Sequence, residues 1–410
     1  MNKTMLNHYA QLAMEVGLQV KEGDIVSIRC PVEAQAFGRA AVQAAYEAGA
    51  KEVDINWGDD FVTRQRFENE ALDHFTRFPE WQKVKFTDLA ERGAKFLAIS
   101  SADPDLLDGI DSQKIIANQK STAKGLEAYR KKMMNDEVSW CVISVPTGKW
   151  AQKIFPDQTE EEAVESLWDR IFAATRMHET DPIAAWKAHL DDLQKRQDFL
   201  QKHDFEKLHF TSDKGTDLEI LLPEGHVWTS GGSKNAKGEP FVANLPTEEV
   251  FTLPHKTGVN GVVYSTKPLN YGGQLIDDFR LVLKDGRVEE YQAAQGEKAL
   301  TELFSVDEGS RYLGEVALVP YHSPISDTGI IFYNTLFDEN AACHLAFGEA
   351  YPTSLSGGEK MTEEELQEKG VNRSLSHVDF MIGDATLSIT GITKDGKEVP
   401  VFEKGNWAFS

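Results

Sequence analysis

The chain has 410 residues, of which 41% are hydrophobic and 27% are charged. This length exceeds what one hydrophobic core organises, so we expect two or three domains, and the composition excludes disorder as the main state. With 43 Lys and Arg against 66 Asp and Glu, the net charge is −23. A surface this acidic repels phosphate backbones, which argues against nucleic acid as a partner.

The cysteines and the N-terminus indicate a cytoplasmic protein. Cys30, Cys141 and Cys343 are the only cysteines, and their spacing forms no CxxC motif or disulfide framework. This usage is typical of a reducing compartment. The first residues lack the apolar core of a signal peptide, and the longest apolar runs are only strand-sized. We therefore expect no membrane association.

The first part of the chain alternates between helix and strand patterns. Helical patterns cover residues 4–17 and 33–48, and short apolar runs predict strands at 24–29, 53–57, 95–100 and 139–145. Strands separated by helices predict a parallel α/β sheet. No GxGxxG or GxxxxGK[ST] motif follows any of these strands, so a nucleotide site has no motif support.

Two helices are predicted next. Residues 159–174 form the first, with Thr159 as its N-cap and acidic residues in its first turn. Asp181 and Pro182 begin a longer helix to about residue 203, which we interpret as a connector between domains.

The pattern changes after residue 206. Strand composition at 217–222, 261–265 and 279–283, with the hairpin signals Asp285-Gly286 and Asp395-Gly396, predicts mainly antiparallel sheet. We therefore predict an α/β N-terminal domain over 1–206, mostly parallel sheet with helices and including the connector. An α+β C-terminal domain rich in antiparallel sheet follows over 207–410.

His377 and Asp379 lie two apart in a segment of strand composition. Alternate residues of a strand share a face, so imidazole and carboxylate project together, as two ligands of one metal centre would. A hydrogen-bonded His/Asp pair on a sheet is the structural alternative.

His344 and Tyr351 lie in or beside residues 340–348, for which we predict a short amphipathic helix with His344 in its middle and Gly348 as the C-cap. A single helical His is commonly a hydrogen-bonded, partly buried residue, and a Tyr commonly packs with its hydroxyl bonded. Neither residue indicates a site by itself.

Two carboxylates have unusually apolar surroundings. Glu315 lies in a strand pattern over 312–319 that otherwise reads as buried, and the pair Glu248 and Glu249 is flanked by strand formers and prolines. A buried ionised Glu costs several kcal/mol unless it is paired or binds a metal. Pairing with an Arg such as Arg311 or Arg373 is the structural alternative.

The four segments, in this order, closely resemble the bacterial dinuclear metal aminopeptidase family typified by thermophilic aminopeptidase T. They read LPTEEVFT, GEVALV, DENAACHLAFG and SHVDFMIG, and the resemblance covers essentially the whole chain. It also includes residues 140–146 and 215–218.

The resemblance implies an active site made of six residues that are expected to bind the metals, which are Glu249, Glu315, His344, Tyr351, His377 and Asp379. Glu315 and Tyr351 are also expected to be catalytic. The family position is the Glu directly before Val250, which favours Glu249 over Glu248. Glu339 and His255 lie near the motifs and are expected to be supporting residues at most.

The resemblance implies a metallo-aminopeptidase that releases N-terminal residues of short peptides through a hydroxide held by two divalent ions. Oxygen and imidazole ligands without thiolate suit Zn²⁺, Co²⁺, Mn²⁺ or Mg²⁺. Glu315 is a bridging ligand, a general base or both, and Tyr351 is expected to help stabilise the oxyanion. The resemblance also implies a homodimer whose active sites face an enclosed cavity.

Two other functions remain open at this stage. One is a metal-dependent amidase or deaminase acting on a non-peptide substrate. The other is a non-catalytic binding protein with a structural metal, which would require a closed coordination sphere.

Overall fold

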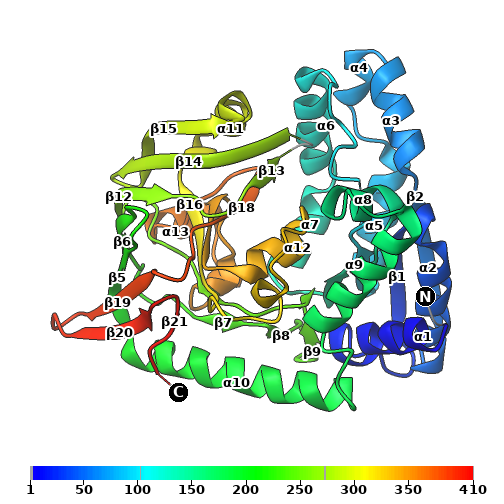
Figure 1. The fold of residues 1–410 in the computed structure, drawn as a ribbon, viewed down its shortest axis with the longest axis horizontal. Helices are drawn as coiled ribbons and strands as arrows, with labels where there is room; N and C mark the ends of the chain where they lie inside the picture. The colour runs from blue at the N-terminus through cyan, green and yellow to red at the C-terminus, as the bar shows by residue number, and fades with distance from the viewer. Residues whose placement is uncertain (1–2, 102, 272–273, 410) are drawn as a thin grey trace. The chain divides into compact units, whose positions relative to one another are not determined.

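The fold is that of a computed structural model that describes residues 3–101, 103–271 and 274–409 (Figure 1). The chain divides into two compact units. The first unit comprises Met1–Leu190, Gly231–Thr247 and Phe332–Leu336, and the second comprises Asp191–Ser230, Glu248–Ile331 and Phe337–Ser410. The domain boundaries 1–206 and 207–410 stay a prediction. The two units are groups of residues in mutual contact, which is not the same as segments that fold independently.

A five-stranded sheet with the order β10-β4-β3-β1-β2 forms the centre of the first unit. Every neighbouring pair in it is parallel, which confirms the predicted α/β sheet. The edge strand β10 comes from far downstream and was not predicted. The strands are β1 (Ile25–Pro31), β2 (Glu52–Gly58), β3 (Lys95–Ile99), β4 (Trp140–Ile143) and β10 (Asn244–Leu245).

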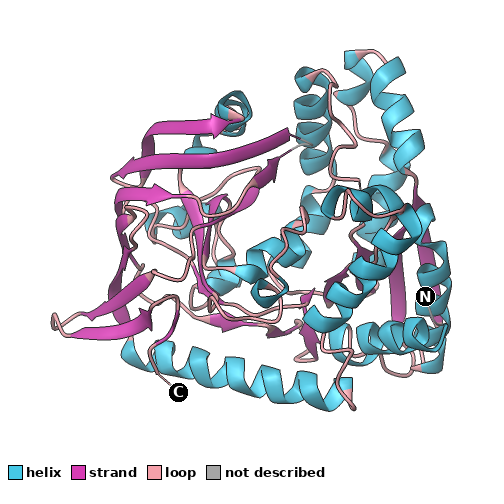
Figure 2. Ribbon diagram, in the orientation of Figure 1, coloured by secondary structure: helices cyan, strands magenta, loops and turns pink. Residues whose placement is uncertain are grey.

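Helices make up most of the rest of this unit (Figure 2). The predicted N-cap Thr159 is confirmed, because its hydroxyl accepts from the backbone N–H of Glu162 in a capping box. The helices are α1 (Lys3–Leu12), α2 (Gln35–Glu47), α3 (Asp60–Asn69), α4 (Leu72–Phe75), α5 (Glu80–Glu91), α6 (Ser112–Gly125), α7 (Glu127–Met134), α8 (Gly148–Ile154) and α9 (Glu160–Ala174).

The connector helix is α10 (Pro182–His203), and its start is confirmed by the backbone N–H of Ala184, which donates to Asp181 at 3.0 Å. Further along the chain, residues 231–247 return to the first unit with the hairpin strands β8 (Gly232–Lys234) and β9 (Pro240–Val242).

A buried lysine ties this hairpin to the parallel sheet. Lys95 in β3 is only 2% exposed, and its ammonium lies 2.9 Å from the Asp24 carboxylate and 3.8 Å from Glu239, which precedes β9. It also donates to the main-chain oxygen of Gln19 at 2.8 Å. A buried ammonium needs such partners, so these contacts specify where residues 231–247 attach.

The larger sheet of the second unit has nine strands in mainly antiparallel order, β13-β14-β12-β6-β5-β19-β20-β21, with β15 paired to β14. Both predicted hairpin turns are confirmed, at Asp285-Gly286 between β14 and β15 and at Asp395-Gly396 between β19 and β20. The strands are β5 (Phe205–Thr211), β6 (Asp217–Leu221), β12 (Val259–Tyr264), β13 (Leu269–Tyr271), β14 (Gln274–Lys284), β15 (Arg287–Gln295), β19 (Ser388–Thr393), β20 (Glu398–Glu403) and β21 (Asn406–Trp407).

A second, antiparallel sheet of this unit has the order β18-β17-β16-β11-β7. One face joins the hydrophobic core through Val316, Leu345, Phe347 and Phe380. The strands are β7 (Thr229–Ser230), β11 (Val250–Thr252), β16 (Leu313–Leu318), β17 (His344–Gly348) and β18 (His377–Met381), and short helices are α11 (Glu297–Leu303), α12 (Thr335–Asp338) and α13 (Glu363–Glu368).

The predicted helix over 340–348 is wrong. After a 3-10 turn at Glu339–Ala341 the chain enters β17, whose five residues are all buried between β16 and β18. A central strand that is covered on both faces loses the polar alternation that marks a strand, and the Ala residues at 341, 342 and 346 favoured a helix instead. His344 is therefore the first residue of a strand, and Gly348 is its last.

None of the helices in the described ranges combines the length and apolar character needed to cross a bilayer.

Asp136 is a half-buried acid that links the end of α7 to the hairpin of residues 231–247. It has a left-handed backbone with φ of 50°, and its carboxylate accepts from the Ser233 hydroxyl and from the Trp140 indole N–H at 3.4 Å. Burial raises the pKa of Asp136 to about 6. The unfolded pKa is about 3.9, so the folded chain binds the proton more tightly and stability falls as pH rises between these values.

We predict that Asp136→Asn removes this pH dependence, because the variant lacks the carboxyl group that titrates. Asn is the suitable substitute because it also tolerates the left-handed backbone. The variant should gain roughly 1–2 kcal/mol over the wild type above about pH 6.5 and lose this gain toward about pH 4. Differential scanning calorimetry of both proteins across that range measures the difference. A difference that does not change with pH would contradict the assignment.

Candidate metal centre

Three strands of the second antiparallel sheet, β16, β17 and β18, place polar side chains on the face opposite the core. Residues directly opposite each other in an antiparallel pair share a face. Glu315 in β16 lies opposite Ala346 in β17, which in turn lies opposite Asp379 in β18. His344 and His377 share this face, because each lies two residues from a member of that row.

Glu249 reaches the same face from the other side. It precedes β11, in which Phe251 pairs with Ala317 of β16. Ala317 lies two residues from Glu315 and also pairs with His344. Glu249 is two residues from Phe251, so the period of two directs all these side chains to one face.

Small residues leave room above this face. Ala317 and Ala346 have only a methyl group, and Gly348, which pairs with His377, has none. Gly348 has a φ of 97°, and a Cβ there would lie 2.1 Å from the main-chain oxygen of Ser376, so no other residue fits. Larger side chains at these positions would fill the space between the carboxylates and imidazoles.

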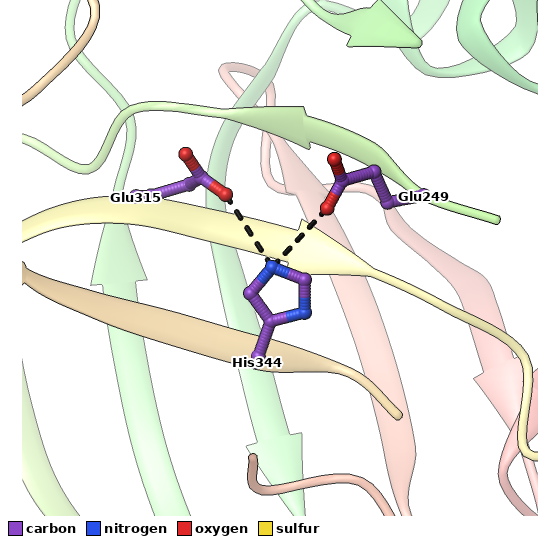
Figure 3. Close-up of side chains that lie close together, drawn as sticks. All are labelled: Glu249, Glu315 and His344. Carbon is purple, nitrogen blue, oxygen red and sulfur yellow. Dashed lines mark ion pairs between the residues drawn. The ribbon is translucent and has the colours of Figure 1, made fainter. Parts of the chain in front are cut away.

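The first group of side chains consists of Glu249, Glu315 and His344, which point toward one another (Figure 3). The Nε2 atom of His344 lies 3.2 Å from Glu249 Oε2 and 3.4 Å from Glu315 Oε1. All three residues are buried. One ligand atom from each lies within 4.8 Å of the others, which is close enough to surround a single cation.

The second group consists of Glu315, His377 and Asp379, and it meets the same 4.8 Å limit. The Nε2 atom of His377 lies 3.3 Å from Asp379 Oδ1 and 3.6 Å from Glu315 Oε2. The expectation that His377 and Asp379 project together is confirmed. Glu315 belongs to both groups, and its two oxygens approach different imidazoles.

Hydrogen bonds on the far side of each imidazole set its orientation. The Nδ1 atom of His344 lies 3.1 Å from the main-chain oxygen of Ala342, and that of His377 lies 2.7 Å from the main-chain oxygen of Glu349. A carbonyl oxygen only accepts, so each Nδ1 carries the proton that it donates. In the neutral ring this leaves the lone pair on Nε2, the atom that faces the carboxylates.

The pKa values show how strongly negative the cluster is. Burial raises the pKa of Glu315, and the negative charges of Asp379 and Glu249 raise it further. Burial lowers the pKa of His344, but hydrogen bonds to Glu249 and Glu315 outweigh it, and the pKa lies well above its ordinary value. Burial also lowers the pKa of His377, but the negative charges of Asp379 and Glu315 raise it by more, and this pKa is about 10.

Protons on these imidazoles and carboxyls therefore balance a buried excess of negative charge. These residues could hold a divalent cation, which would balance the same charge more completely and would take the place of the protons.

Tyr351 lies beside the second group. Its ring meets the imidazole of His377 edge-on, with the centroids 5.1 Å apart, and packs against Phe251 at 6.0 Å. Burial raises the pKa of Tyr351 well above its ordinary value, and the charges of Glu315 and Asp379 add to this effect. The phenol is therefore a neutral hydrogen-bond donor at the edge of the cluster.

A further carboxyl, Glu339, senses the charges of this cluster, which is compatible with a supporting role. Burial raises the pKa of Glu339 well above its ordinary value, and the charges of Asp379 and Glu249 raise it further. Glu339 lies in the 3-10 turn just before β17, and the sequence did not indicate this position because a helix was predicted there. The pair Glu248 and Glu249 also separates here, because only Glu249 belongs to a ligand group.

The alternative that Glu249 or Glu315 pairs with Arg311 or Arg373 does not match the contacts of these two arginines. Arg311 lies over the ring of Phe304, and Arg373 pairs with Glu349 and Glu363. The thiol of Cys343 contacts the backbone of Val319, as expected for a packed residue. The donors are thus carboxylate oxygens and imidazole nitrogens, a set that suits Zn²⁺, Co²⁺, Mn²⁺ or Mg²⁺.

Comparison with known proteins agrees with the resemblance and the fold. The chain matches the thermophilic metalloprotease family M29 over residues 2–407. It is 50% identical to aminopeptidase AmpS of Bacillus subtilis (strain 168) over 404 residues, which cover 98% of each chain. It is 47% identical to aminopeptidase 2 of Geobacillus stearothermophilus over 404 residues, again 98% of each chain. The solved structure of wild-type AmpT from Thermus thermophilus is similar, with a TM-score of 0.92 and 38% identity over 99% of this chain and 100% of that one.

The neighbouring residues Glu248 and Glu249 provide a matched pair of variants. We predict that Glu249→Gln weakens binding of a divalent ion at least about 10-fold, because a neutral amide replaces a charged ligand. Glu248→Gln should change this affinity far less. Isothermal titration calorimetry on metal-free protein measures both. Equal losses in the two variants, or a loss only in Glu248→Gln, would contradict the assignment.

Proposed function

We propose that this chain, which belongs to the M29 family of thermophilic metalloproteases, binds two divalent ions through the two ligand groups. Glu249 and His344 serve one ion, His377 and Asp379 the other, and Glu315 serves both. The chain is a metallo-aminopeptidase of that family.

The shared carboxylate of Glu315 is the observation that carries this proposal. Its Oε1 atom lies 3.4 Å from His344 Nε2, and its Oε2 atom lies 3.6 Å from His377 Nε2. Two ions about 3.5–4 Å apart need a ligand between them, and a carboxylate can bind one ion with each oxygen. Since each oxygen of Glu315 already faces a separate imidazole, the side chain is oriented for this role.

The charge supports two ions. The carboxylates of Glu249, Glu315 and Asp379 carry −3 when ionised, and two divalent ions carry +4. The remaining positive charge matches one hydroxide. When bound, the two ions would polarise the scissile carbonyl and lower the pKa of a shared water toward neutrality.

The side chains of this site then have separate tasks. Glu315 can accept a proton from the water, in addition to its role as a ligand. The neutral hydroxyl of Tyr351 can donate a hydrogen bond to the oxygen on which negative charge develops. We expect the free α-amine of the substrate at the metal or at the carboxylates, which would favour cleavage next to a free N-terminus.

Short peptides are the substrates that this site and family support best. We expect the homodimer and enclosed cavity that the family resemblance implies, and such a cavity would exclude folded proteins. A cytoplasmic location agrees with three cysteines that are all buried and unpaired. Light scattering during gel filtration tests the dimer.

Removal of the metal tests the proposed activity. We predict that a chelator abolishes hydrolysis of aminoacyl-nitroanilides and short peptides, and that Zn²⁺, Co²⁺, Mn²⁺ or Mg²⁺ restores it. The same peptides with an acetylated N-terminus are the matched control and should not be cleaved. Activity that persists without any divalent ion would contradict the proposal. Absence of turnover with every ion and peptide would favour an amidase or deaminase instead.

Glu315→Gln tests the bridging role. We predict that the bound metal falls from two ions to one or fewer per chain, and that kcat/KM falls at least about 1000-fold. Metal analysis of the dialysed protein and peptide kinetics measure the two effects. Two retained ions with a lost rate would restrict Glu315 to general-base catalysis, and no change in either would contradict the site.

A further inference from the structure

Glu349 is a second buried carboxylate, and it lies outside both ligand groups. It follows β17 directly and is only 5% exposed. The guanidinium of Arg373 neutralises it, with Nη1 at 2.5 Å from Oε1. The same guanidinium donates to Glu363 in α13, from Nε at 2.6 Å and from Nη2 at 3.1 Å. Arg373 thus joins two acids that are separated along the chain.

The main chain of Glu349 contacts the segment that leads into β18. Its oxygen accepts from Nδ1 of His377 at 2.7 Å, and its N–H donates to the oxygen of Ser376 at 2.7 Å. Its second carboxylate oxygen accepts from the N–H of Ser374 at 2.5 Å. One residue therefore holds both the imidazole of His377 and the backbone before it.

The ladder between β17 and β18 ends at the pair Gly348 and His377, and residues 349–376 lie outside both strands. Backbone contact continues for a short distance, because the N–H of Ala350 donates to the main-chain oxygen of Asn372 at 3.1 Å. Tyr351 lies at the start of this connection and α13 lies within it. The bond from Arg373 to Glu363 ties the middle of the connection back to the start of β18.

We propose that Arg373 and Glu349 form a positioning pair that holds the imidazole of His377 with Nε2 directed at Glu315 and Asp379. The pair rests on the proposed function, since it prepares His377 to bind the second ion. The carboxylate of Glu349 is fixed by Arg373 and by Ser374, so its main-chain oxygen stays in place to accept from Nδ1. Groups that orient a ligating His typically affect metal affinity or activity by about 10–100-fold.

The first ion position does not depend on this pair. The Nδ1 atom of His344 meets the main-chain oxygen of Ala342, only two residues away along its own chain segment. Loss of the Arg373–Glu349 pair should therefore weaken one of the two ions selectively. A general loss of stability would weaken both.

The test uses full-length Arg373→Gln, with Glu349→Gln as a second variant that keeps the main-chain oxygen. We expect calorimetric titration of metal-free protein with Co²⁺ to show one ion bound about 10–100-fold more weakly and the other nearly unchanged. At saturating Co²⁺, kcat should fall while KM for a short peptide stays close to the wild-type value. Arg373→Lys should restore part of the affinity, because an ammonium can still pair with Glu349.

Glu363→Gln is the matched control, because it removes the exposed partner of Arg373 and leaves Glu349 paired. It should bind both ions as the wild type does, and thermal unfolding of every variant reports whether it folds. If Arg373→Gln does not fold, Glu349→Gln and Arg373→Lys decide the question. Folded variants with two unchanged affinities, or with both ions weakened equally, would overturn the positioning pair. A wild type that binds no divalent ion would overturn the proposed function as well.

Discussion

The structure of this site depends on one constraint, which is that negative charge collects on the polar face of a buried sheet. Glu249, Glu315 and Asp379 approach one another around two imidazoles, in a place that is largely shielded from water. Such a group of carboxylates is stable only with cations among its members. The raised pKa values of His344 and His377 show that protons take this place when nothing else does.

The strand period explains how one short sheet satisfies this constraint. Alternate residues of β16, β17 and β18 supply apolar side chains to the core and polar side chains to the opposite face. On that face, the residues between the charged ones are Ala317, Ala346 and Gly348. The same alternation therefore provides the ligands, the space above them and the hydrophobic packing that keeps the strands in register.

The sequence alone predicted those parts of the site that depend on a local pattern of polar and apolar residues, and it did not predict those that depend on contacts between distant segments. His377 and Asp379 were expected on one face because a strand has a period of two, and Glu315 was singled out because its segment was otherwise apolar. The secondary structure around His344 was wrong because burial on both faces of β17 removed the polar alternation. His344 was identified only through the family resemblance. The strand β10 and the pair Arg373–Glu349 depend on contacts between distant segments, for which the local sequence contains no signal.

The two imidazoles illustrate why the long-range contacts matter for function. In both rings a main-chain oxygen holds Nδ1, so Nε2 is left for the carboxylates and any bound ion. For His344 that oxygen comes from Ala342, and the geometry is set within one segment. For His377 it comes from Glu349, whose carboxylate pairs with Arg373. The same chemical solution is thus local for one ligand, whereas for the other it joins two segments that the salt bridge between Arg373 and Glu349 also connects.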